Sequence, residues 1–309
     1  MRHIAISAFP KASSKSNMAW SRIIQWMEKN IPGFRLILWE DFLKHDYFPH
    51  VQTITYPYSG NGIPADDITC LIEKYPHTKK IWLYNEKDLS LDSCVKRLFI
   101  DDFEIITNIE DRNNSTERAS KKLNLLNMNL TAFREEVVPI PFEDRKYDLI
   151  YWGTWRPGRA DYMKEYLKDC YVSTAPSNVP SFKMFCDNIT FIDKLMWGRT
   201  QGTLGNFRFT LYIEDKQTHE LFNHMSDRFY EAMSFDVIQF IDINVKNNVI
   251  KSGYDIDPWF FVSNRKELEE KMEYAKAHPD EIMKKQAKLK QIVLDELKEL
   301  RNKFLEIYK

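Results

Sequence analysis

The chain has 309 residues, of which 43% are hydrophobic and 14% aromatic, and its formal net charge is -1. This composition is typical of a globular protein with a large core, and the length suggests about two domains. The balanced charge argues against a strongly basic protein dedicated to binding nucleic acid.

The four cysteines stand far apart and include no CxxC pair, which argues against both a zinc site and a disulfide framework. The apolar run near the N-terminus is too short for a signal peptide. No stretch approaches the roughly 18 apolar residues that a membrane span needs. We therefore expect a soluble cytoplasmic protein without a transmembrane segment.

In the first half of the chain, short β-branched or aromatic runs alternate with helical patterns, the rhythm of βα units. The expected strands span residues 4–9, 34–39, 52–56, 80–84 and 103–108. The expected helices span residues 18–29, 67–74 and 116–126. Pro139 and Pro141, in a stretch of mixed charge, indicate the crossing to a second domain.

The second half restarts with an expected strand over 147–152, a turn over 153–159 and a helix over 160–168. Further strands are expected at 171–174 and 207–213. Glycines in the turn permit close approach of the backbone, and Arg156 and Arg159 supply charge suited to a diphosphate. The turn is neither a GxGxxG motif nor a P-loop, so an ordinary βα loop is the alternative interpretation.

The segment 226–242 joins a polar helix start to an apolar strand. Ser226 is a suitable N-cap, and Arg228 and Glu231 are three residues apart on one helix face. An apolar run over 237–241 is typical of a strand in a parallel sheet covered on both faces. At such a junction Arg228 would clamp a diphosphate and Glu231 would accept hydrogen bonds from ribose hydroxyls. A solvated Arg and Glu pair is the alternative.

The C-terminal part over 266–308 is strongly helical in pattern and is interrupted at His278 and Pro279. Its apolar residues form stripes at helical spacing. Packing back on the first domain explains these stripes, and a short coiled coil is the alternative.

The order of these motifs resembles the GT-B family of glycosyltransferases, over about residues 147–264. In many members a polar residue and Arg are followed, after two positions, by Glu-Ala-Met or Glu-Ala-Leu, and then by a small residue, Gly and an apolar strand. Arg228 and the run Glu231-Ala232-Met233 match this pattern. Phe235-Asp236 replaces the usual Gly before the strand.

This resemblance implies an α/β fold with two Rossmann-like domains facing across a cleft and C-terminal helices bracing the N-terminal domain. The N-terminal domain, residues 1–140, would bind the acceptor. The C-terminal domain, residues 141–285, would bind the nucleotide sugar. Residues 286–309 would form a helix that packs back on the first domain.

The resemblance also implies a donor site in the second domain. Glu231 would bind the ribose, Arg228 and the helix start would face the diphosphate, and the end of strand 207–213 would flank the base. The expected donor-binding residues are Gly153, Thr154, Arg156, Arg159, Arg208, Tyr212, Ser226, Arg228 and Glu231. Retaining members carry a second glutamate eight positions before the first, but this chain has Asn223 there, so the stereochemical outcome stays open.

An inverting enzyme needs a general base near the acceptor hydroxyl. Glu86 and Asp88 follow an expected strand, and ligands of open α/β sheets collect at the carboxyl ends of strands. Solvated loop charges are the alternative interpretation of both. Basic and aromatic residues of the first half, including Lys15, Tyr58 and Arg112, are the expected acceptor contacts.

No metal site and no tightly bound cofactor are expected. Asp255 and Asp257 match the DxD metal motif of another glycosyltransferase architecture, but they lie late in the chain, just before Pro258. The histidines at 45, 50, 219 and 224 do not share helix faces. The co-substrate would be a nucleotide sugar, with a UDP-sugar as the first choice.

The sequence therefore predicts a nucleotide-sugar-dependent hexosyl- or pentosyltransferase. The predicted acceptor is a hydroxymethylated pyrimidine in double-stranded bacteriophage DNA, which would place the protein in the host cytoplasm. A bacterial surface glycan or lipopolysaccharide is the alternative acceptor. A non-catalytic α/β module that binds a nucleotide is the second alternative.

Overall fold

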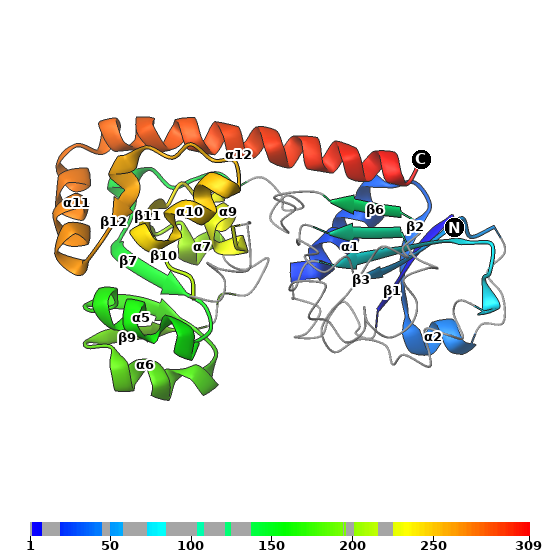
Figure 1. Cartoon of the computed structure of the whole chain (residues 1–309), viewed down its shortest axis with the longest axis horizontal. Helices are drawn as coiled ribbons and strands as arrows, with labels where there is room; N and C mark the ends of the chain where they lie inside the picture. The colour runs from blue at the N-terminus through cyan, green and yellow to red at the C-terminus, as the bar shows by residue number, and fades with distance from the viewer. Residues whose placement is uncertain are drawn as a thin grey trace. The chain divides into compact units, whose positions relative to one another are not determined.

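The computed structural model describes residues 2–7, 19–44, 50–57, 73–84, 104–107, 121–124, 137–193, 195, 201–215 and 225–309. The chain divides into two units (Figure 1). Unit 1 comprises Met1–Arg134 and Leu297–Lys309, and unit 2 comprises Glu135–Glu296.

Unit 1 contains a six-stranded parallel sheet with the order β2-β1-β3-β4-β5-β6. Its strands are β1 (His3–Ser7), β2 (Phe34–Leu38), β3 (Thr53–Pro57), β4 (Lys79–Tyr84), β5 (Glu104–Thr107) and β6 (Lys121–Asn124). The described helices of its N-terminal part are α1 (Ala19–Asn30) and α2 (Trp39–Lys44). Ile4, Ala5 and Ile6 are all fully buried, as expected for a strand covered on both faces.

The predicted helix over 116–126 is wrong where the structure describes it. Lys121–Asn124 form strand β6, which pairs in parallel with β5 along its whole length. The local pattern favoured a helix, but pairing with a neighbouring strand overrides such weak preferences.

Unit 2 contains a second parallel sheet of six strands with the order β12-β11-β10-β7-β8-β9. Its strands are β7 (Tyr147–Trp152), β8 (Cys170–Ser173), β9 (Ile189–Ile192), β10 (Phe207–Tyr212), β11 (Ile238–Asp242) and β12 (Phe261–Val262). The chain builds outwards from β7 to β9 and then returns to the other side of β7 with β10. This is the doubly wound Rossmann order, and its topological switch point lies between β7 and β10.

Helices connect these strands, as parallel strands require. The α-helices are α5 (Ala160–Tyr166), α6 (Val179–Phe185), α7 (Gln201–Leu204), α9 (Asp227–Ser234), α10 (Lys246–Lys251), α11 (Arg265–Ala277) and α12 (Pro279–Ile307). Short 3-10 turns are η5 (Phe142–Asp144), η6 (Pro157–Arg159), η7 (Pro176–Asn178), η8 (Ile243–Val245) and η9 (Pro258–Phe260). The strand, turn and helix predicted from residue 147 onwards are therefore present, and α9 begins directly after Ser226 as predicted.

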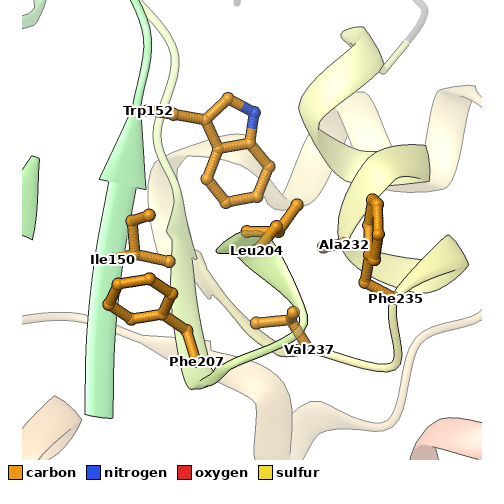
Figure 2. Packing of buried hydrophobic residues seen from close by; sticks show 7 residues of the cluster. All are labelled: Ile150, Trp152, Leu204, Phe207, Ala232, Phe235 and Val237. Carbon is orange, nitrogen blue, oxygen red and sulfur yellow. The ribbon is translucent and has the colours of Figure 1, made fainter. Parts of the chain in front are cut away.

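A buried apolar cluster fixes α9 against the sheet (Figure 2). Figure 2 shows side chains from β7, from the start of β10 and from α9 meeting around Leu204. The cluster consists of Ile150, Trp152, Leu204, Phe207, Ala232, Phe235 and Val237. Because Ala232 is fully buried here, the neighbouring turn of α9 is held at a defined place over the ends of β7 and β10.

The C-terminal helical region breaks at His278, and α12 begins with Pro279, as the sequence predicted. Residues of α12 up to Glu296 belong to unit 2, and those from Leu297 belong to unit 1, later than the expected start at residue 286. Within unit 1, the Tyr308 ring packs edge-on against His3 and Phe34, and its hydroxyl shares a hydrogen bond of 2.7 Å with Thr55. The C-terminal helix therefore braces the first unit, as expected.

No helix in the described part of the chain is both long and apolar enough to cross a bilayer.

Candidate functional site

Charged side chains gather in unit 2 at the carboxyl ends of β7 and β10, on both sides of the switch point. Gly153 follows β7 directly, Glu214 and Asp215 lie just beyond β10, and α9 starts with Asp227. In open α/β sheets of this topology, ligands bind at this place.

Glu214 joins two arginines that come from different segments. Its Oε1 accepts a hydrogen bond of 2.6 Å from Nη2 of Arg228 on α9. Its Oε2 accepts a short hydrogen bond from Nη2 of Arg159 in η6. The Glu214 side chain is only 2% exposed, and those of Arg159 and Arg228 are 7% and 11% exposed. Oδ2 of Asp215 also lies 3.5 Å from Nη2 of Arg159 and 3.5 Å from Nη1 of Arg156. The site therefore holds three arginines and two carboxylates, which leaves one positive charge in excess.

Tyr151 links the same two arginines a second time. Its hydroxyl oxygen, at the end of β7, accepts hydrogen bonds from Nη1 of Arg228 at 2.7 Å and from Nη1 of Arg159 at 3.4 Å. The Arg228 guanidinium also lies 5.3 Å from the centre of the Tyr151 ring, within cation–π range. Two like charges are thus held side by side by one carboxylate and one phenol.

The hydrogen bonds of Arg228 leave one donor unused. Its terminal nitrogens also donate to the carbonyls of Trp152 at 3.2 Å and Ile213 at 3.1 Å. Within the described residues, Nε of Arg228 and Nε of Arg159 have no hydrogen-bond acceptor. Buried donors in native proteins almost always have a partner, so each of these N–H groups calls for an acceptor that is not among these side chains.

The cluster is charged at neutral pH. Burial alone would raise the pKa of Glu214, but Arg228 and Arg159 outweigh it and hold that pKa below its ordinary value. Burial alone would lower the pKa of Arg228, but Tyr151 and Glu214 beside it outweigh burial and raise that pKa above its ordinary value. An ionised Glu214 carboxylate therefore lies between two permanently charged guanidinium groups.

Gly153 is required by the position of Arg228. Its φ of 148° lies in a region that residues with a Cβ rarely adopt, and a Cβ at this position would lie 2.6 Å from Nη1 of Arg228. The sequence predicted that glycine here permits close approach. In the described structure the group that approaches Gly153 is the guanidinium of Arg228.

Glu231 lies on α9 and is 7% exposed. Its Oε2 accepts a hydrogen bond of 2.8 Å from Nε1 of Trp152. The interpretation of Arg228 and Glu231 as a solvated surface pair is therefore wrong. The indole bond therefore holds this carboxylate beside the carboxyl end of β7.

Tyr212 and Ser226 meet at the start of α9, where the Ser226 backbone N–H donates to the Tyr212 hydroxyl at 2.8 Å. Ser226 is the N-cap residue by position, but its side chain makes no capping hydrogen bond. Tyr212 is 1% exposed, so the start of α9 rests on a buried side chain.

Three predicted donor residues lie nearer the surface. Thr154 is exposed, and the Arg156 side chain is 59% exposed, with its Nη1 3.5 Å from Oδ2 of Asp215. Arg208 is the second residue of β10 and donates to Asp148 at 3.1 Å, near the amino ends of the strands. Residues of one strand rise about 3.3 Å each, so the structure does not bring Arg208 to the site.

The other predicted site residues lie outside the described part of the chain. They are Glu86 and Asp88, expected to act as the base, and Lys15, Tyr58 and Arg112, expected to contact the acceptor.

Glu214 and Tyr151 were missed in the sequence. Glu214 and Asp215 directly follow the expected strand over 207–213 and were a usable signal, because the rule that selected Glu86 and Asp88 applies equally to them.

Asp257 has a structural role. Its Oδ1 accepts the Trp259 N–H at 2.9 Å, its Oδ2 pairs with Lys285 at 2.7 Å, and these hydrogen bonds lower the pKa of the carboxyl. The Asp257 carboxylate is therefore engaged in contacts within the chain. Within the described ranges, no three His, Cys, Asp or Glu side chains cluster so as to hold a metal ion.

The departure at Phe235-Asp236 has a local explanation. Asp236 adopts a φ of 54°, the left-handed conformation for which glycine is usual. Its carboxylate pairs with Lys290 at 2.7 Å, and its carbonyl accepts a hydrogen bond of 2.7 Å from the buried Arg145. Aspartate tolerates this conformation better than most residues, so the turn keeps its shape without glycine.

No family model matches the sequence, and no curated protein sequence matches it at a significant level. Several solved structures resemble it. T4 phage BGT, in complex with UDP and Mn2+, has a TM-score of 0.62 and 16% identity, over 100% of this chain and 97% of that one.

An alpha-glucosyltransferase in complex with UDP and a 13-mer DNA containing an HMU base has a TM-score of 0.58 and 9% identity, over 95% of each chain. Sucrose-phosphate synthase from Thermosynechococcus elongatus also has a TM-score of 0.58, with 10% identity, over 100% of this chain and 99% of that one. The chain therefore has the GT-B fold, with two Rossmann-like domains, as predicted.

Proposed function

We propose that this protein is a glycosyltransferase that uses a nucleotide sugar and binds this donor in unit 2. The observation that carries the proposal is the pair of buried arginines at the switch point between β7 and β10. Each keeps an N–H donor without an acceptor among the described residues, and with Arg156 they place three arginines beside the two carboxylates of Glu214 and Asp215, which leaves one positive charge in excess. An anion with several oxygens, such as a diphosphate, matches this arrangement.

In this proposal the donor spans the ends of β7, β10 and α9. The diphosphate lies against the guanidinium groups of Arg159 and Arg228, and the exposed Arg156 reaches it from the turn. Glu231 accepts hydrogen bonds from the ribose hydroxyls while it keeps its bond to Trp152. Thr154 and the segment after Tyr212 line the remaining sides.

The reaction is a transfer at the anomeric carbon. An acceptor hydroxyl forms a bond to this carbon, the bond from the carbon to the diphosphate oxygen breaks, and the nucleoside diphosphate leaves with the electron pair. The hydroxyl proton passes to a general base, for which Glu86 and Asp88 remain the proposed candidates. The arginines stabilise the charge that develops on the leaving group.

UDP is the proposed nucleotide. Two solved structures that share the fold are complexes with UDP, and one of these also contains DNA with an HMU base. We propose a hydroxymethylated pyrimidine in double-stranded DNA as the acceptor, with Lys15, Tyr58 and Arg112 as contacts. A bacterial surface glycan and a silent nucleotide-binding module are the competing outcomes.

A transfer assay tests the proposal. The protein is incubated with UDP-, GDP- and other nucleotide sugars and with duplex DNA containing 5-hydroxymethylcytosine or 5-hydroxymethyluracil, with Mn2+ or with a chelator. Mass spectrometry of the nucleosides is expected to show a hexose or pentose added to the modified base. Binding of a nucleoside diphosphate without transfer to DNA would move the acceptor to glycans, and no binding of any donor would refute the proposal.

Two variants separate binding from chemistry. Glu231→Gln is expected to weaken donor binding by about 1–3 kcal/mol, because it removes charged hydrogen bonds to the ribose. Glu86→Gln is expected to abolish transfer and to leave donor affinity unchanged. A fully active Glu86→Gln variant would remove that residue as the base.

A further inference from the structure

We propose that Glu214 is a positioning residue for the donor diphosphate, which it serves by holding Arg159 and Arg228 in one fixed arrangement. This inference rests on the proposed function of the site. Glu214 does not face the diphosphate as a ligand, since its two oxygens already accept hydrogen bonds from the two guanidinium groups.

The connectivity shows why a bridge is needed. Arg159 belongs to the turn after β7, and Arg228 belongs to α9, which follows β10. The two guanidinium groups donate to the same Tyr151 oxygen, so two cations lie close together in a place where water does not screen them. Without the Glu214 carboxylate the repulsion between these cations is less compensated, and the two arginines keep only Tyr151 as a shared hydrogen-bond partner.

The buried position of Glu214 makes this role specific. The residue is 2% exposed, and each of its oxygens serves a different arginine, so the two arginines are oriented at the same time. Each guanidinium also donates to the Tyr151 hydroxyl, so each is held by at least two acceptors at once. The two guanidinium groups are then fixed before the ligand arrives, which lowers the ordering cost of binding.

A positioning role and a purely electrostatic role of Glu214 predict opposite changes in diphosphate affinity when its charge is removed. If Glu214 acted only through its charge, removing a negative charge beside an anion site would strengthen diphosphate binding. If it positions the arginines, the same change weakens binding, because one guanidinium loses its acceptor and moves.

The test compares Glu214→Gln with a matched control, Asp148→Asn, in the full-length protein. Asp148 also pairs with two cations, Arg208 and Lys276, but it lies at the start of β7, at the opposite edge of the sheet. Both variants remove one negative charge from the same sheet. Calorimetric titration with UDP, GDP, ADP, CDP and TDP first identifies the diphosphate that binds the wild type most tightly.

We expect Glu214→Gln to weaken the binding of that diphosphate at least tenfold and Asp148→Asn to change it less than twofold. Affinity for the corresponding nucleoside, measured by competition, is expected to stay within twofold for both variants, since the ribose contact at Glu231 is unaffected. A general loss of structure would lower both affinities together, and circular dichroism and the thermal midpoint report it directly. If Glu214→Gln does not fold, Glu214→Asp replaces it, with the same expected direction because the shorter side chain cannot reach both arginines.

Equal or tighter diphosphate binding by the folded Glu214 variant overturns the positioning role and leaves the proposed function standing. A wild type that binds none of the nucleoside diphosphates refutes the proposed function itself, and the role of Glu214 fails with it.

Discussion

Replacement of Gly153 by alanine tests the close contact between the end of β7 and Arg228 on α9. The native φ of 148° costs a residue with a Cβ about 1–3 kcal/mol. The added Cβ would also lie 2.6 Å from Nη1 of Arg228, which donates to Tyr151. Displacing that charged hydrogen bond costs about 1.5–3 kcal/mol more. We therefore expect Gly153→Ala to destabilise unit 2 by about 2.5–6 kcal/mol.

Gly253 provides the matched control. It also has a positive φ, 87°, but a Cβ there would meet no atom within 4 Å. Gly253→Ala is therefore expected to cost only the backbone term, about 1–3 kcal/mol. The difference between the two variants measures the steric conflict with Arg228.

A double-mutant cycle in urea isolates that conflict. In an Arg228→Met background the guanidinium is gone, so Gly153→Ala is expected to cost only about 1–3 kcal/mol, which gives a coupling of about 1.5–3 kcal/mol. Unfolding should be followed with probes in each unit, because the two units can unfold separately. The same cost of Gly153→Ala in both backgrounds would refute the reasoning, since it would mean that Arg228 does not occupy the space beside this glycine.

Three further predictions concern stability. Asp236→Ala is expected to destabilise unit 2 by about 1–2 kcal/mol and Asp236→Gly by less, because only glycine adopts a φ of 54° freely; equal urea midpoints for the two variants would contradict this. Tyr308→Phe is expected to destabilise unit 1 by about 1–2 kcal/mol, since it leaves the buried hydroxyl of Thr55 without its partner, and an unchanged midpoint would refute that contact. Burial lowers the pKa of His3, so the unfolded chain, with an ordinary pKa of about 6.5, takes up a proton first; stability of unit 1 should fall as the pH drops below that value, and His3→Gln should flatten this slope between pH 7.5 and 5.5.

Local patterns in the sequence predicted several helices and strands of unit 2 correctly. The strand from Tyr147 to Trp152 and the helix after Ser226 are where the apolar periods and the polar helix start placed them. These elements depend on residues close in sequence. Prediction from pattern is strongest where neighbours in sequence decide the structure.

The arrangement of the charges could not be predicted in this way. Glu214, Arg159 and Arg228 come together only because β10 lies beside β7, and that order is set by the crossover of the chain and not by any local pattern. Arg208 was misplaced for a related reason, since its position along β10 decides at which end of the sheet it lies. The strand Lys121–Asn124 likewise depends on its partner β5.

Hydrogen exchange read by mass spectrometry, with and without UDP, tests the proposed donor site most directly. The account predicts slower exchange in peptides that cover Gly153–Arg159 and Ser226–Glu231, where the diphosphate and ribose would lie. Peptides at the amino ends of β7 and β10, around Asp148 and Arg208, should exchange at the same rate in both samples. Protection confined to the amino ends, or saturating UDP without any protection in unit 2, would contradict the account.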